Sequence, residues 1–505
     1  MNKSLCFAGA ALAAVSFLVV SVGGCSEDTP APLTPAGTSD AGSGGETGAS
    51  VTPLAEPAVP CSDAEEAIYA DPGAQPADPG NRGKILKCSK GQVVTKEALQ
   101  GELTRLEYKG KPLTSGARVY RVQYGTTRGD PSSTPGYSSA IVYVPTTQRG
   151  DKLPVVVVGR GSRGQAARCA VSKLDPSVAV NDDAYALVYP LVGSGYAVIV
   201  PDLAGYAAYG AAKNPPSAYA QAQDVARSTL DGSRALKKLY PQLGDQTVLV
   251  GHSQGGHSVL SALALAETYG VEGTLAGVGV YAPLWLSQRS WGAILDKELA
   301  FSRNYTITNL GAASSVSVWY HYTQAELLDG PGEGIKLFTP AKQAAVKKFI
   351  DEACWGELKT LEDNATYAYE LFEPAFTQSV GFPATGLGGG CTNGTCEKWL
   401  ARYSADRPHL TGKAATTPIY LAYGLKDTTI DPGRMACALD RLKADGAKLT
   451  VCVDAEAGHG SILDTAGERV SDWIASLTLG GAAPAACAQN ESAITASCST
   501  PPPND

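Results

Sequence analysis

The stretch QTVLVGHSQGGHSVL, at residues 246–260, decides the fold of this chain. Its apolar and β-branched residues at 247–250 predict a strand, and the Ala- and Leu-rich residues 258–267 predict a helix. Between them, Gly251-His252-Ser253-Gln254-Gly255 matches G-x-S-x-G, which in this context forms a nucleophile elbow. We predict that Ser253 is a nucleophile in a strained turn, with small residues needed two positions to either side. The alternative is a chance match, because the chain holds 56 Gly.

Strands and helices alternate along much of the chain. The pattern predicts strands at 152–159, 196–201, 247–250, 418–424 and 449–453, and helices at 184–192, 220–239, 433–445 and 465–477. An antiparallel pair is expected earlier, at 118–124 and 138–144, after a short helix at 95–103. This order is typical of an α/β fold with a mostly parallel central sheet flanked by helices.

Residues 285–410 interrupt this alternation. Helices are expected at 340–353 and 365–372, followed by a Gly-rich loop at 385–390. We interpret the segment as a helical cap inserted over the site, with ordinary peripheral helices as the alternative. The α/β domain with this insertion would then span 61–480, followed by a Pro- and Ala-rich tail at 481–505.

The N-terminus is typical of an exported protein. Lys3 precedes an apolar run, and Val22-Gly23-Gly24-Cys25 resembles a bacterial lipoprotein signal in which Cys25 is lipidated. Residues 1–25 are therefore expected to be a signal peptide, with an ordinary signal peptide or a retained membrane anchor as alternatives. Residues 26–60, rich in Gly, Ser, Thr, Ala and Pro, predict a disordered linker. We expect an outer-membrane lipoprotein or a secreted protein.

Cysteine usage also indicates export. The chain has 12 Cys. Cys6 lies in the expected signal peptide and Cys25 would carry the lipid, so ten remain, and an oxidising compartment would pair them. Connectivity cannot be deduced from a sequence, but proximity favours Cys61–Cys88, Cys391–Cys396, Cys437–Cys452 and Cys487–Cys498, which leaves Cys169–Cys354.

The charge balance limits the possible partners. The chain has 41 Lys and Arg against 49 Asp and Glu, a net charge of −8, and it contains no basic run. This composition argues against nucleic acid and permits a neutral or apolar substrate, such as a small-molecule or lipid ester. The membrane contact that we expect is the N-terminal lipid, and we expect a monomer.

A serine nucleophile needs a base and an acid that orients it. The chain has five His: His252, His257, His321, His409 and His459. His252 lies inside the elbow, His257 is interpreted as a packing residue, and His321 and His409 fall in the expected cap. His459 lies between Gly458 and Gly460 in a loop after the last strand, so we predict that it is the base.

The acid should follow the penultimate strand. Asp427 does so, whereas its competitor Asp431 precedes Pro432 and is typical of a helix N-cap. We predict Ser253, Asp427 and His459 as a catalytic triad. For the oxyanion hole we predict the backbone N–H of Gln254 and a second donor from the loop 159–164, Ser162 or a neighbour.

The layout resembles the α/β-hydrolase superfamily and, within it, the secretory lipase family, over roughly residues 115–480. Arg160-Gly161-Ser162 and Cys169-Ala170-Val171-Ser172 stand where that family typically has His-Gly-Thr and Cys-Ala-Pro-Ser. Asp231-x-x-Arg234-Ala235 resembles the helix before the elbow. The resemblance implies a capped serine lipase or esterase. Arg160 and Arg163 could instead bind an anionic group of the substrate.

We therefore expect a serine carboxylic ester hydrolase that works through an acyl-enzyme and needs no metal or organic cofactor. Two alternatives remain open. One is a peptidase or acyltransferase that uses the same triad, because fold does not determine substrate. The other is a surface binding protein with a vestigial site.

Overall fold

A computed structural model describes residues 54–176, 182–211, 214–387, 389–464 and 466–498. The expected signal peptide and its lipidation site Cys25 lie outside these residues, as does most of the expected linker. None of the helices in the described part of the chain combines the length and apolarity needed to cross a bilayer.

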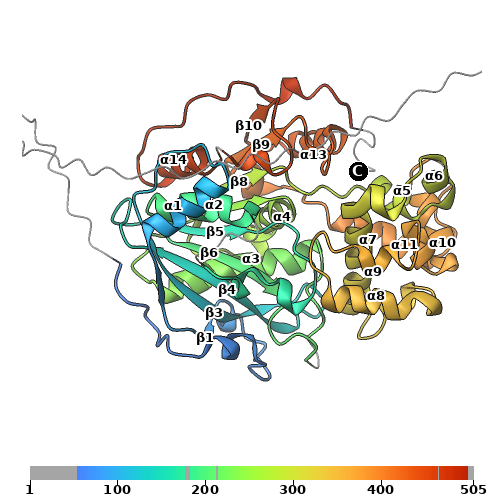
Figure 1. The fold of residues 1–505 in the computed structure, drawn as a ribbon, viewed down its shortest axis with the longest axis horizontal. Coiled ribbons are helices and arrows are strands. Elements are labelled where there is room, and N and C mark those ends of the chain that lie inside the picture. The colour runs from blue at the N-terminus through green and yellow to red at the C-terminus, as the bar shows by residue number, and fades with distance from the viewer. Residues whose placement is uncertain (1–53, 177–181, 212–213, 388, 465, 499–505) are drawn as a thin grey trace, which may run out of the picture. The chain divides into compact units, whose positions relative to one another are not determined.

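One mixed sheet organises most of the described chain (Figure 1). Among the described residues it has ten strands, in the order β1-β3-β4-β6-β5-β7-β8-β9-β10 with β2 beside β3. β4 is antiparallel to both β3 and β6, whereas the strands from β6 to β10 along the sheet are parallel. The strands are β1 (Ile85–Cys88), β2 (Gln92–Val94), β3 (Ala117–Thr127), β4 (Pro135–Pro145), β5 (Val155–Gly159), β6 (Val198–Ala204), β7 (Gln246–His252), β8 (Thr274–Tyr281), β9 (Ile419–Gly424) and β10 (Leu449–Asp454).

Helices cover both faces of this sheet, because its central strands are apolar on both sides. β5 and β6, for example, are buried along their whole length. One group of helices contains α3 (Ala222–Leu239) and α4 (Gln254–Tyr269), which pack on each other and on the strands. A second group contains α1 (Lys96–Arg105), α2 (Asp182–Gly193) and α14 (Ala466–Thr478), and α13 (Pro432–Ala444) joins β9 to β10. The predicted α/β fold with a mostly parallel sheet is confirmed.

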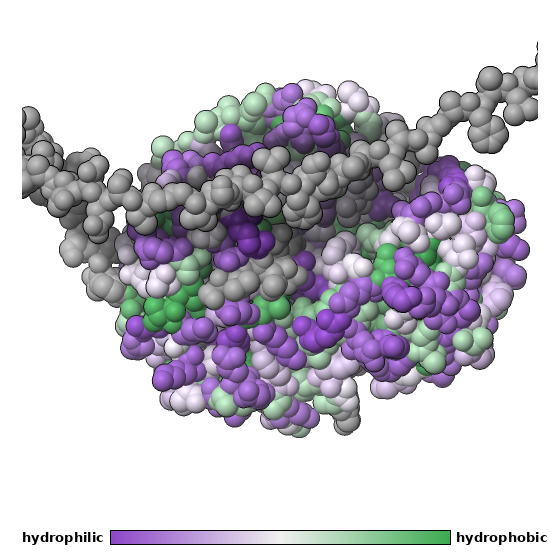
Figure 2. Space-filling view, viewed as in Figure 1, coloured by the Kyte–Doolittle hydropathy of each residue, from purple (hydrophilic) through white to green (hydrophobic). Residues whose placement is uncertain are grey.

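The chain between β8 and β9 is helical and has its own apolar core. We use "the cap" for α5–α11, which lie together beside the sheet in Figure 1. Trp291, Trp319 and Trp399 are fully buried there, and the Trp319 ring stacks on Phe349. Polar residues cover most of the visible cap surface (Figure 2). The helices are α5 (Gln288–Leu295), α6 (Lys297–Ser302), α7 (Ile307–Leu328), α8 (Pro340–Glu352), α9 (Lys359–Glu362), α10 (Pro374–Ala384), α11 (Gly394–Ala405) and, packed on α4, α12 (Gly412–Thr416).

Several elements differ from the sequence prediction, and two of them show why. The strand β8 was not predicted, because Gly277 and Gly279 lower its strand propensity. The structure needs the first of them, since a Cβ on Gly277 would lie 2.7 Å from the ring of Trp473. The helix predicted at 365–372 is a single 3₁₀ turn at Ala368–Leu371, and the next helix, α10, begins at Pro374.

The structure contains five disulfides among the described residues, and three join the cysteines that we predicted: Cys61–Cys88, Cys169–Cys354 and Cys391–Cys396. The predicted Cys437–Cys452 and Cys487–Cys498 pairs are wrong. Instead, Cys437 pairs with Cys498 and Cys452 with Cys487. The tail explains this, because the N–H of Val453 on β10 donates to Gln489 O, which lays the tail along the strand that carries Cys452.

Candidate active site

The turn between β7 and α4 has the geometry of an elbow. Ser253 has φ 54° and ψ −121°, a conformation that is strained for a residue with a side chain. Close approach explains the flanking glycines: a Cβ on Gly255 would lie 2.0 Å from Gly159 O, and one on Gly251 would lie 2.3 Å from Gly255 O. Because β5 and α4 close on the turn, both positions need a residue without a Cβ, as expected from the sequence. Ser253 stands at the N-terminus of α4, where the helix dipole favours negative charge.

Asp427 and His459 are in contact. Asp427 Oδ2 lies 2.7 Å from His459 Nδ1, and its Oδ1 accepts hydrogen bonds from the N–H groups of Thr429 and Ile430 at 2.8 Å. The Asp427 side chain is completely buried, so the carboxylate is held in one orientation. A proton on His459 Nδ1 that is donated to Asp427 leaves Nε2 with its lone pair, which is the form that a general base requires.

The loop that carries His459 is fastened to the residue before the nucleophile. His252 Nε2 lies 2.8 Å from the backbone O of His459, and the two rings are 4.6 Å apart. Burial, followed by the nearby His459, lowers the pKa of His252 to about 3, so its ring is neutral and donates to that oxygen. In the sequence, His252 stands out only as a residue of the elbow motif. Its role in anchoring His459 depends on a contact across 207 residues that the local pattern does not reveal.

The competing acid Asp431 is the N-cap of α13. Its Oδ1 accepts hydrogen bonds from the N–H groups of Gly433 and Arg434, as its position before Pro432 predicts. Its Oδ2 lies 3.3 Å from Arg434 Nε. The carboxylate that contacts the imidazole is therefore that of Asp427.

The loop after β5 lies against the elbow. Ser162 Oγ is 2.6 Å from Tyr219 Oη, and Ser162 lines the same cavity as Ser253. Arg160 is buried, and its Nη1 donates to the side-chain Oε1 of Gln254 at 2.9 Å. Its other hydrogen bonds go to the backbone O atoms of Gly161 and Asp202. These contacts favour a structural role for Arg160 that holds the residue after Ser253, rather than the alternative role in binding an anion.

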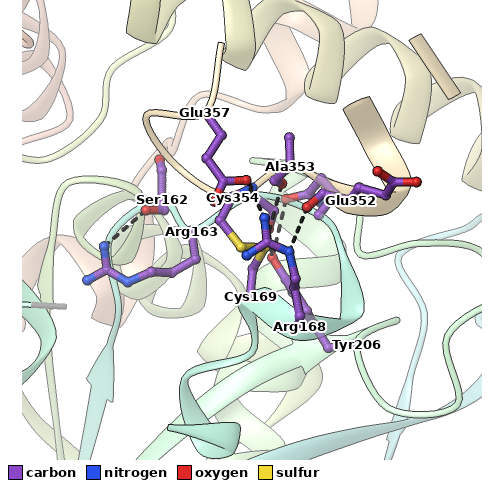
Figure 3. The surroundings of a disulfide bond; sticks show 11 residues. Ser162, Arg163, Arg168, Cys169, Tyr206, Glu352, Ala353, Cys354 and Glu357 are labelled. Carbon is purple, nitrogen blue, oxygen red and sulfur yellow. Dashed lines mark hydrogen bonds and ion pairs between the residues drawn. A yellow bond between two sulfur atoms is a disulfide. The ribbon is translucent and has the colours of Figure 1, made fainter. Parts of the chain in front are cut away.

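A disulfide connects this loop to the cap (Figure 3). Cys169 is bonded to Cys354, just beyond the end of α8, and Arg163 O accepts a hydrogen bond from the N–H of Trp355 at 3.0 Å. Arg168 adds a hydrogen bond from its Nε to Glu352 O and an ion pair with Glu357. Residues 163–169 of this loop are therefore tied to the segment 352–357 at the end of α8.

Two other histidines are buried in packed surroundings. His257 Nε2 is 2.6 Å from Asp406 O, and His321 Nδ1 is 2.7 Å from Ser317 O inside the cap core. Burial lowers the pKa of His257 to about 4 and that of His321 to about 3. The interpretation of His257 as a packing residue agrees with these contacts. His409 lies on the surface beside Asp445.

We expect acid to destabilise the fold through these buried rings. Between about pH 6.5 and pH 4, unfolded His257 binds a proton that the folded ring does not, so stability falls as the pH falls through this window. One such ring contributes a slope of about 1.4 kcal/mol per pH unit. His257→Gln, whose amide can still donate to Asp406 O, should reduce the slope of unfolding free energy against pH by about that amount. Urea unfolding from pH 4.5 to 8 measures it, and an unchanged slope would contradict the assignment.

The chain is similar in sequence and in fold to known proteins. A sequence model of the alpha/beta hydrolase family matches residues 181–473. No curated protein sequence matches the chain. Among solved structures, Candida antarctica lipase A in its closed state is similar at 16% identity and TM-score 0.58, over 86% of this chain and 89% of that one.

Two bacterial structures are similar as well. A putative hydrolase from Legionella pneumophila matches at 15% identity and TM-score 0.59, over 78% of this chain and 99% of that one. The rice cell wall degrading esterase LipA from Xanthomonas oryzae matches at 18% identity and TM-score 0.55, over 79% and 96%. At these identities the likeness shows the shared fold.

Proposed function

This chain belongs to the alpha/beta hydrolase family, and from that premise we propose that it is a serine carboxylic ester hydrolase. The observation that carries the proposal is the Asp427–His459 pair, 2.7 Å apart, on a loop fastened to His252, the residue before Ser253. An acid that orients an imidazole, which in turn takes a proton from a serine, is the arrangement that activates a hydroxyl.

In the proposed mechanism, Ser253 Oγ attacks the acyl carbonyl while His459 Nε2 takes its proton. The imidazolium then protonates the leaving alcohol, and Asp427 stabilises the charge on the ring. The N–H groups of Gln254 and Ser162 hold the negative oxygen of the tetrahedral intermediate. A water, deprotonated by His459, next attacks the acyl-enzyme and releases the acid and free Ser253.

The proposal includes export. Five disulfides in the described residues are consistent with an oxidising compartment. We place the protein in the cell envelope, anchored by a lipid on Cys25, or in the medium. Mass spectrometry of the N-terminal peptide from the native host tests the anchor, and an unmodified Cys25 in the mature protein would rule it out.

A fluorophosphonate probe tests the serine mechanism. We expect the folded wild-type protein to incorporate one probe per chain, with the adduct on the peptide that contains Ser253, and Ser253→Ala to incorporate none. Ser258→Ala, a change in the same helix four residues beyond Gln254, whose O its hydroxyl contacts, is the matched control and should still label. A folded wild-type protein that does not label would favour a binding protein with a vestigial site.

A further inference from the structure

Two adjoining cavities near the elbow differ in size and chemistry, and Ser253 lines one of them. The inner one, of about 40 Å³, is lined by Ser253 and Ser162, and the outer one has about 310 Å³. They share a wall, because the same residues line both: Ser290, Ile294, Ala312, Ala313, Thr429 and Arg434. An ester held at Ser253 would therefore have its acyl half in the inner cavity and its alcohol half directed past these shared residues into the outer one.

The inner cavity is small and apolar. Leu284, Leu286, Trp291 and Val316 form its wall, with Trp355 from the segment after α8. Since one water needs roughly 10–15 Å³ measured in this way, about 40 Å³ accommodates roughly three water-sized groups. With the carbonyl at Ser253, this leaves room for the methyl or ethyl group of a short acyl chain.

The outer cavity is polar and larger. Tyr305, Asn309, Thr428 and Arg434 contribute hydroxyl, amide and guanidinium groups to it. The charge of Arg434 is balanced by Asp431, whose Oδ2 lies 3.3 Å from Nε, so the cavity offers donors and acceptors without a strong net charge. Such a surface favours an uncharged group that carries several hydroxyls over either a carboxylate or an alkyl chain.

We infer that the substrate is a short-chain acyl ester, acetyl or propionyl, of an uncharged alcohol with several hydroxyl groups, such as a carbohydrate. Arg434, at the wall between the two cavities, is then the residue that selects the alcohol. This inference rests on the proposed function, and it adds the class of both halves of the ester.

The first experiment measures the acyl half on the purified full chain. We expect kcat/KM for p-nitrophenyl esters to fall at least about tenfold from acetate to octanoate, because the longer chain has no room beside Trp291 and Val316. A preference for octanoate would overturn the short-chain assignment. A wild-type protein that hydrolyses none of these esters, or hydrolysis that survives in Ser253→Ala, would instead contradict the proposed function itself.

The second experiment measures the alcohol half. Methyl 6-O-acetylglucoside and cyclohexylmethyl acetate carry the same acyl group on a six-membered ring, with and without hydroxyls. We expect kcat/KM to favour the sugar ester, and Arg434→Met to lower the ratio of the two values about tenfold through a higher KM for the sugar. Lys348→Met, which removes an exposed cation from α8, is the control and should leave the ratio unchanged.

A second variant keeps the inference testable if Arg434→Met does not fold. Asn309→Ala changes an exposed position of α7 that lines the outer cavity, and it should lower the same ratio severalfold. A ratio that favours cyclohexylmethyl acetate in the wild type would overturn the inference. So would a ratio that neither variant lowers.

Discussion

Asp427→Asn is expected to lower kcat on p-nitrophenyl acetate about ten-thousand-fold, with little change in stability. The amide oxygen can still accept the hydrogen bonds from Thr429 and Ile430 that Asp427 Oδ1 accepts now. The new NH₂ group would then face His459 Nδ1 and donate to it. This reverses the tautomer, so Nε2 carries the proton and cannot take one from Ser253.

Asp431→Asn is the matched control, four residues along the chain. Asn caps helices as well as Asp does, so the N–H groups of Gly433 and Arg434 keep their acceptor. We expect kcat on the same aryl acetate to fall less than tenfold. A larger loss in Asp431→Asn than in Asp427→Asn would move the acid to the other position. Equal, small losses of kcat in both variants would mean that neither carboxylate takes part in the mechanism.

The contact between Asp427 and His459 could be predicted because each residue follows a strand with a strong local pattern. β9 and β10 are short apolar runs and are parallel neighbours, so the loops after them meet at one edge of the sheet. The long-range contacts that hold the residues next to Ser253 in place could not be predicted. Arg160 reaches Gln254 across 94 residues, and nothing in the sequence around either residue indicates the other.

The same distinction applies to the fold. Apolar runs such as β5 predict a strand directly, whereas β8 is interrupted by Gly277, where Trp473 of α14 leaves no room for a Cβ. The helix α7 is buried on several sides, so its apolar residues do not form the single stripe that marks an amphipathic helix. Cysteine pairing followed proximity in the sequence at Cys391–Cys396 but not in the tail, where the path of residues 487–498 along β10 brings distant partners together.

Removing the Cys169–Cys354 disulfide, as the double variant Cys169→Ser/Cys354→Ser, is expected to give the largest loss of stability. The bond closes a loop of 185 residues, for which the chain-entropy model gives about 5 kcal/mol of stabilisation through the unfolded state. The variant should also lose activity, because this bond holds loop 159–169, which contains the proposed oxyanion donor Ser162, to the end of α8 (Figure 3). Arg168 and its contact with Glu352 O would remain as a weaker connection.

The matched control is Cys391→Ser/Cys396→Ser, which opens a bond that spans five residues at the start of α11. The same model gives about 2 kcal/mol for a loop this short, so the two double variants should differ by about 3 kcal/mol. Urea unfolding measures stability, and kcat/KM on p-nitrophenyl acetate measures the site. We expect the control to keep its activity, since the Cys391–Cys396 bond does not join the cap to loop 159–169. Equal losses of activity would mean that the Cys169–Cys354 bond acts on the site only through overall stability and not by positioning loop 159–169.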